Sequence, residues 1–132
     1  MTGVVLYLLL IIGCNSDNNP DDPNGGWYLI SDKKEVLGEV IFNKYDVDEI
    51  WIESSKNAYN VTGRFTPDAI VRLGTFTEQN IGKILGFVLD GEIITYPVIE
   101  QKNEEGRFSI VCTKKSKAQR VYESLLIGKL NL

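Results

Sequence analysis

Residues 80–99 read NIGKILGFVLDGEIITYPVI, and the elements of the rest of the chain are arranged around them. Gly82 is typical of a helix end, because glycine readily takes the left-handed conformation that closes a helix. The apolar run 84–89 predicts a strand that begins soon afterwards. Asp90 and Gly91 form a dipeptide suited to a two-residue hairpin turn, and the residues that follow predict the returning strand. The order is therefore helix, strand, turn, strand.

The segments before this stretch predict further strands and the start of the helix. Four runs have strand composition, at 27–30, 36–42, 49–53 and 58–65. Thr66 followed by Pro67 predicts a helix N-terminus, with threonine as the cap and proline in the first turn. Gly74 lies beside Thr75, which begins a second capping-box pattern. We therefore expect two short helices at an angle between residues 66 and 82.

After the hairpin the sequence predicts one more strand and a closing helix. In that strand Phe108, Ile110 and Cys112 fall on one face by alternation. From Ser116 onward apolar residues recur at helical spacing, and Gly128 is predicted to end the helix. This order of elements indicates an α+β fold, in which an antiparallel sheet carries helices packed on one face.

Two patterns in the chain resemble the head subdomain of the large periplasmic domain of SecD, an accessory subunit of the bacterial protein-export channel. The first is Asn-Ile-Gly-Lys from residue 80, then six residues, Asp-Gly, five residues and Pro-Val-Ile. The second is the spacing of small and apolar residues in the last helix, at positions 118, 121, 122, 125, 128 and 130. The resemblance covers roughly 68–130 and implies the fold of the SecD head. The chain departs from the family at Thr95-Tyr96, where the family has Ser-Ala, and at Glu105-Gly106, where it has paired glycines.

The first residues of the chain predict a signal peptide over 1–13. The run Val4–Ile12 is apolar but too short for a helix of roughly 20 residues that spans a membrane. Ile11-Ile12-Gly13-Cys14 resembles the lipobox of bacterial lipoproteins, which implies that Cys14 receives a diacylglycerol and becomes the new N-terminus. The alternative is a buried apolar helix that ends in Gly-Cys by chance.

The segment after this cysteine consists almost entirely of Asn, Asp, Ser, Pro and Gly, which leaves it nothing to bury. We therefore expect a flexible tether over 14–26 and a folded domain over 27–132. Together with the lipobox, this organisation predicts a lipid-anchored protein of the cell envelope, at the outer membrane or at the outer face of the cytoplasmic membrane.

The composition argues against several classes of function. The net charge is −4, and no run of lysine and arginine interleaved with aromatic residues offers a nucleic-acid surface. The chain has no histidine, which excludes Ser-His-Asp, Cys-His and histidine-based metal sites. We interpret Asp46, Asp48 and Glu49 as a solvated loop rather than a metal site. We interpret Cys112 as a small buried hydrophobe rather than a reactive thiol.

Asp90 and Glu92 flank the turn glycine and have the residue types of a general acid and base. A hairpin tip is solvated, however, and solvated carboxylates keep their ordinary acidity. We therefore expect no catalytic residue, no metal and no cofactor.

Thr95, Tyr96 and Pro97 form the candidate binding surface. Proline cannot donate to a strand ladder, so the strand ends or lies at an edge there, and an edge can accept an extended peptide. The tyrosine ring would anchor that peptide. The alternative places Tyr96 in the core beneath the last helix.

These residues favour binding over catalysis. We expect a non-enzymatic envelope lipoprotein that binds a polypeptide, either an exported chain or a subunit of an envelope complex. One alternative is an inhibitor or immunity-like binder of a single partner, and another is a small envelope enzyme that uses carboxylates alone. The resemblance to SecD implies a connection with protein export.

Overall fold

This computed structural model describes residues 25–130 of the chain, with side chains described up to residue 126. The predicted signal peptide, Cys14 and nearly all of the predicted tether lie outside the described residues. The elements in chain order are β2 (Gly26–Ile30), β3 (Val36–Asn43), the 3-10 turn η1 (Lys44–Asp46), β4 (Val47–Ser54), β5 (Tyr59–Phe65), α1 (Pro67–Gln79), β6 (Ile84–Leu89), β7 (Glu92–Thr95), β8 (Arg107–Cys112) and α2 (Lys115–Leu130).

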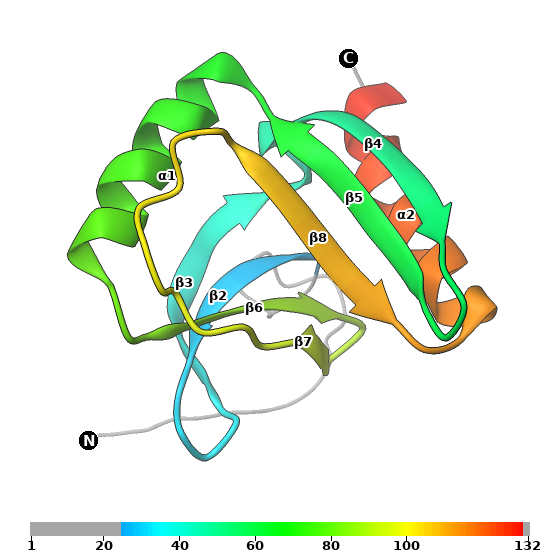
Figure 1. Cartoon of the computed structure of the whole chain (residues 1–132), viewed down its shortest axis with the longest axis horizontal. Helices are drawn as coiled ribbons and strands as arrows, with labels where there is room; N and C mark the ends of the chain where they lie inside the picture. Colours follow the sequence, from blue (N-terminus) through cyan, green and yellow to red (C-terminus); the bar gives the residue numbers. More distant parts are fainter. Residues whose placement is uncertain (1–24, 131–132) are drawn as a thin grey trace.

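The described strands form two antiparallel sheets, in the orders β3-β2-β6-β7 and β4-β5-β8 (Figure 1). The chain crosses from the first sheet to the second through η1, returns through α1, and crosses again between β7 and β8. The α+β class predicted from the sequence is confirmed. The strands nevertheless divide between two sheets, whereas the sequence pattern predicts one.

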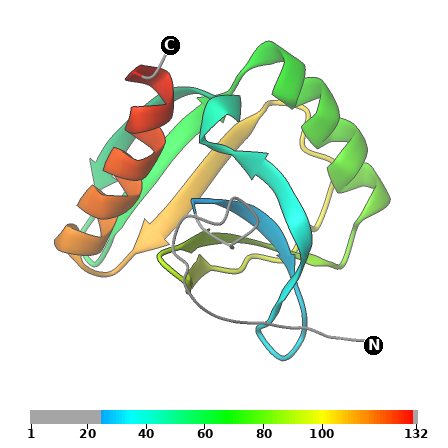
Figure 2. The ribbon, with the colours of Figure 1, turned by 180° about the vertical axis from the view of Figure 1, so that it is seen from behind.

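Both helices pack toward the interior of the molecule. Helix α2 lies against the three-stranded sheet, in front of it in Figure 2, and α1 follows directly from the end of β5. Ala69 and Leu73 of α1 and Val121 and Leu125 of α2 are all buried in the same core cluster. Their burial places the apolar stripes of both helices in one hydrophobic core.

The centre of that core is a group of aromatic rings drawn from both sheets. The Trp27 ring makes edge-to-face contacts with three phenylalanine rings, at centroid distances of 5.0 Å to Phe65, 4.9 Å to Phe87 and 5.0 Å to Phe108. Such contacts contribute about 0.5–1.5 kcal/mol each beyond area burial. Phe108, Ile110 and Cys112 share the core face of β8, as alternation predicts.

Helix α1 is one continuous helix, so the prediction of two short helices at an angle is wrong. Its cap is as predicted, because the Thr66 hydroxyl accepts a hydrogen bond from the Ala69 amide at 3.3 Å. Gly74 is buried in the middle of the helix, facing the backbone carbonyl of Asn103 and the Lys102 side chain. A glycine weakens a helix by about 1 kcal/mol without ending it.

Helix α2 also continues past the residue predicted to end it. The helix runs to Leu130, so the prediction of Gly128 as its stop is wrong. As in α1, a glycine weakens the helix without ending it.

Two other glycines take the predicted left-handed conformation. Gly82 has a φ of 91°, and at the hairpin tip Asp90 and Gly91 have φ values of 54° and 75°, as a type I′ turn requires.

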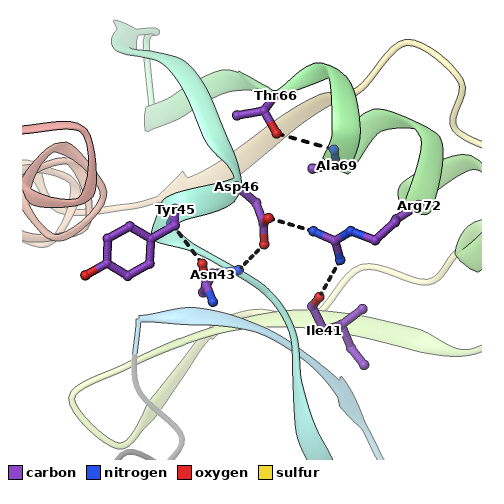
Figure 3. A network of polar contacts seen from close by, with 7 residues as sticks. All are labelled: Ile41, Asn43, Tyr45, Asp46, Thr66, Ala69 and Arg72. Carbon is purple, nitrogen blue, oxygen red and sulfur yellow. Dashed lines mark hydrogen bonds and ion pairs between the residues drawn. The ribbon is translucent and has the colours of Figure 1, made fainter. Parts of the chain in front are cut away.

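A network of polar contacts fixes the corner between the two sheets (Figure 3). The Asp46 carboxylate accepts hydrogen bonds from the Asn43 amide at 2.9 Å and from the Arg72 guanidinium at 2.6 Å. Arg72 comes from α1 and also lies 5.0 Å from the centroid of the Phe42 ring. The sequence pattern predicts a solvated loop at Asp46, but its side chain is only 19% exposed and holds α1 against this corner.

Candidate functional site

A cavity of about 610 Å³ lies between the two sheets, beside the first half of β8. Its apolar lining comes from β2, β5, α1, β6 and β8, through Trp27, Phe65, Leu73, Leu85 and Phe108. Thr95 at the end of β7 and residues 97–105 after it form the other wall. A cavity of this size with an apolar floor is typical of ligand-binding sites.

The segment after β7 forms an edge of the four-stranded sheet. The Leu85 amide donates to the Pro97 carbonyl at 3.0 Å, and the Ile99 amide donates to the Lys83 carbonyl at 2.8 Å. An isolated bridge pairs Val98 with Ile84 between these two bonds. Because backbone groups alternate in direction along a strand, the N–H and C=O of Val98 point away from β6. The edge beside the cavity therefore presents a donor and an acceptor.

The opposite side of the cavity is also a strand edge. In the described sheets β8 pairs with β5 alone and β7 pairs with β6 alone, although β7 and β8 lie beside each other. Two edges thus approach each other without joining their ladders. An edge of this kind is a template for pairing with another extended chain.

The loop between β7 and β8 is held in place by hydrogen bonds. The Asn103 amide donates to the hydroxyl of Thr77 on α1 at 2.8 Å. The Asn103 side-chain oxygen accepts from the amides of Gly106 at 3.0 Å and Glu105 at 3.2 Å. The start of β8 is fixed in turn, because the Phe65 amide donates to the Gly106 carbonyl at 2.8 Å. These bonds give the cavity wall a defined backbone path.

The residues of the predicted binding surface separate in the structure. Thr95 and Pro97 line the cavity, whereas Tyr96 does not. The Tyr96 side chain is 49% exposed, and the Lys34 ammonium lies 4.6 Å from its ring centroid. The alternative that places Tyr96 in the core is therefore wrong.

The carboxylates at the hairpin tip form ion pairs. Asp90 pairs with Arg120, and Glu92 pairs with Lys117 at 2.5 Å, so both contacts join the hairpin to α2.

Among the described residues, no group of three or more His, Cys, Asp or Glu side chains is placed to hold a metal ion. Burial raises the pKa of the Cys112 thiol, which is 2% exposed. The Lys117 ammonium lowers this pKa and the Glu92 carboxylate raises it, both by less than burial does. A buried neutral thiol is a poor nucleophile.

Sequence reasoning misses the floor of the cavity and its loop wall. The residue type of Trp27 suits either a core or a recognition surface, and the structure places it 5% exposed at the cavity floor. Nothing in the polar segment 100–105 signals a binding wall. Its composition is that of an ordinary loop, and only the tertiary arrangement brings it beside the aromatic cluster.

Comparison with known proteins identifies the fold. The sequence profile of the SecDF P1 head subdomain matches residues 17–132. The protein translocase subunit SecD of Aquifex aeolicus (strain VF5) is 34% identical over 77 residues, which are 58% of this chain and 14% of that protein. Among the described residues, no helix combines the length and apolar character needed to cross a membrane.

Solved structures of SecDF have the same fold. One, described as the structure and function of a membrane component SecDF that enhances protein export, matches with a TM-score of 0.62 and 29% identity. The match covers 74% of this chain and 44% of that one. A second, SecDF in a super-membrane-facing form, gives a TM-score of 0.61 and 29% identity, over 74% of this chain and 13% of that one. The chain thus spans less than half of each relative, and it belongs to the SecDF P1 head subdomain family.

Proposed function

We propose that this protein binds extended segments of polypeptide in the cavity between β7 and β8. The observation that carries the proposal is the outward-facing edge at 97–99, which lies directly beside a cavity with an apolar floor and a polar loop wall. A peptide added to this edge would form main-chain hydrogen bonds with it, and alternate side chains would point into the cavity. Thr95, Pro97 and Val98 form the contact surface in this proposal.

The energetics favour such a ligand over a small polar molecule. Each main-chain hydrogen bond contributes about 0.5–1.5 kcal/mol net, which is too little alone to offset the ordering of a flexible chain. Burial of an apolar side chain contributes roughly 1.5–3 kcal/mol more. Trp27, Phe65 and Phe108 form the floor beneath that side chain, and Phe108 is the partly exposed ring of the three. The strand edge at 97–99 and the cavity beside it together suit a peptide with large apolar side chains.

The names of the relatives support a setting in protein export. The relative from Aquifex is a protein translocase subunit, and SecDF is described as a membrane component that enhances protein export. We infer an accessory role near exported polypeptides, without catalysis. The ion-paired carboxylates of the hairpin tip and the buried thiol support a binding role rather than an enzymatic one.

We further propose that the domain is held at a membrane of the envelope by lipid attached to Cys14. The support is the sequence Ile11-Ile12-Gly13-Cys14, followed by a polar tether long enough to separate the domain from the bilayer. The lipid anchor would keep the binding cavity close to polypeptides that emerge at the membrane surface.

Site-specific photo-crosslinking tests the binding proposal. A photoreactive amino acid placed at Val98 in growing cells should form adducts with many polypeptides, and these should disappear when synthesis of exported proteins is blocked. The control position is Val111, which is equally exposed but lies outside the cavity lining. One discrete adduct would favour the single-partner binder instead. Identical adducts from both positions would contradict the proposed site.

A further inference from the structure

The loop that walls the cavity carries an excess of negative charge. Residues 100–105 have the sequence Glu-Gln-Lys-Asn-Glu-Glu, which gives three carboxylates against one ammonium. Every residue of this loop belongs to the cavity lining. Arg107, two residues beyond Glu105 at the start of β8, also lines the cavity. The excess of carboxylates therefore belongs to residues 100–105.

The positive charge in the loop is already neutralised. The Lys102 ammonium lies 3.6 Å from a Glu104 carboxylate oxygen and 3.8 Å from one of Glu78 on α1. Glu100 and Glu105 are exposed, and neither forms an ion pair with another described residue. These two carboxylates are the charges on the wall that remain available to a ligand.

The backbone between these carboxylates is held in place by hydrogen bonds. Asn103 lies between them and is anchored to Thr77 and to the Gly106 amide. A wall that is ordered before binding loses less entropy when a ligand arrives, so its charges discriminate between ligands more effectively. The apolar floor below it supplies affinity but distinguishes poorly between peptides of similar size.

We propose that the cavity prefers polypeptide segments that carry a lysine or arginine close to a large apolar residue. This inference rests on the proposed function and specifies its ligand class. The apolar side chain enters the cavity above Trp27 and Phe108, and the basic side chain lies along the loop near Glu100 and Glu105. Segments with acidic residues in the same place meet like charge and bind more weakly.

Three synthetic peptides test this preference on the full-length chain. Each has about ten residues, the length of a long strand, with the same central leucines in a Thr and Val frame. The leucines are flanked by lysines, by glutamines or by glutamates. We expect the lysine peptide to bind roughly tenfold more tightly than the glutamine peptide, if two exposed ion pairs contribute about threefold each. That advantage should shrink at high salt, because exposed charges are screened.

Two variants assign the effect to the loop. Glu100→Gln with Glu105→Gln should remove most of the advantage that the lysine peptide has over the glutamine peptide on the same variant. Glu39→Gln is the matched control, since Glu39 is exposed on β3 and does not line the cavity. Equal affinity for all three peptides, or a preference that survives the double substitution, overturns this inference while the proposed function stands. Binding of none of the peptides overturns the proposed function itself.

Discussion

Trp27 and Phe108 meet edge to face, with ring centroids 5.0 Å apart and ring planes at 68°. Trp27 belongs to the four-stranded sheet and Phe108 to the three-stranded sheet, so this contact joins the two sheets at the floor of the cavity. The Phe108 ring in turn covers Gly63 on β5, where an added β-carbon would lie 2.6 Å from its Cζ atom. The geometry of the floor therefore depends on a position without a side chain.

The same substitution at two glycines should have opposite effects. In Gly63→Ala the new methyl group would lie 2.2 Å from the Glu49 carbonyl oxygen, a backbone atom that cannot move cheaply. We expect a loss of about 1–3 kcal/mol in the free energy of unfolding. In Gly74→Ala the nearest atoms lie at 3.5 and 3.6 Å, so the higher helix propensity of alanine should stabilise the protein by up to about 1 kcal/mol. Urea denaturation measures both, and a stable Gly63→Ala variant would contradict the close packing of β4, β5 and β8.

The hairpin tip depends on positive φ rather than on packing. Among the described residues beyond its two chain neighbours, no atom lies within 4 Å of a β-carbon built at Gly91, yet its φ is 75°. Gly91→Val should therefore cost about 1–3 kcal/mol through backbone strain alone. Gly91→Asn should cost less, because asparagine tolerates the left-handed region. Equal urea midpoints for the valine variant and the wild type would show that the turn is not of this type in solution.

Cys112 should make stability fall at alkaline pH. Burial raises the pKa of its thiol in the folded state, so the unfolded chain loses its proton first as the pH rises. The stabilisation from this group is complete below the unfolded pKa of about 8.5 and is lost as the pH approaches the higher folded value. The free energy of unfolding should decrease more between about pH 8 and about pH 10 in wild type than in Cys112→Ala. Parallel pH profiles would refute this account of the thiol.

Much of the fold follows from local sequence pattern, and the site does not. The strands and the hairpin are recognisable because alternation and the Asp90-Gly91 turn are local signals. The division into two sheets is not local, since β2 pairs with β6 across more than half of the described chain. Loop 100–105 packs against α1 beside Gly74, which the sequence pattern presents as a helix break.

The side on which Tyr96 lies also depends on a detail that alternation misses. Val88 pairs with Ile93 and Phe87 pairs with Thr95, so Ile94 is an extra residue in β7. Such a bulge reverses the inside and outside positions of the residues beyond it. Thr95 thereby faces the cavity, and Tyr96 lies beneath Lys34 on the surface.

The proposed lipid anchor predicts membrane association that depends on one sulfur atom. One acyl chain binds a bilayer marginally, whereas two or more hold a protein stably. Cys14→Ser should therefore remain an unprocessed precursor without attached lipid, while the wild type should be processed and sediment with membranes. Metabolic labelling with a fatty acid measures the modification. Processed but unlabelled wild type in the soluble fraction would contradict the anchor.

Substitutions at two equally exposed valines test most directly whether polypeptide binds beside the 97–99 edge. Val98 is 50% exposed and lines the cavity, whereas Val111 is 49% exposed on β8 and does not. The glutamine-flanked peptide is titrated into the wild type, Val98→Asp and Val111→Asp, with melting temperatures recorded for all three. We predict at least a tenfold loss of affinity for Val98→Asp, about 1.4 kcal/mol, because bound peptide would desolvate the new charge. Val111→Asp should bind like the wild type, and equal affinity of the two variants would contradict binding at this edge.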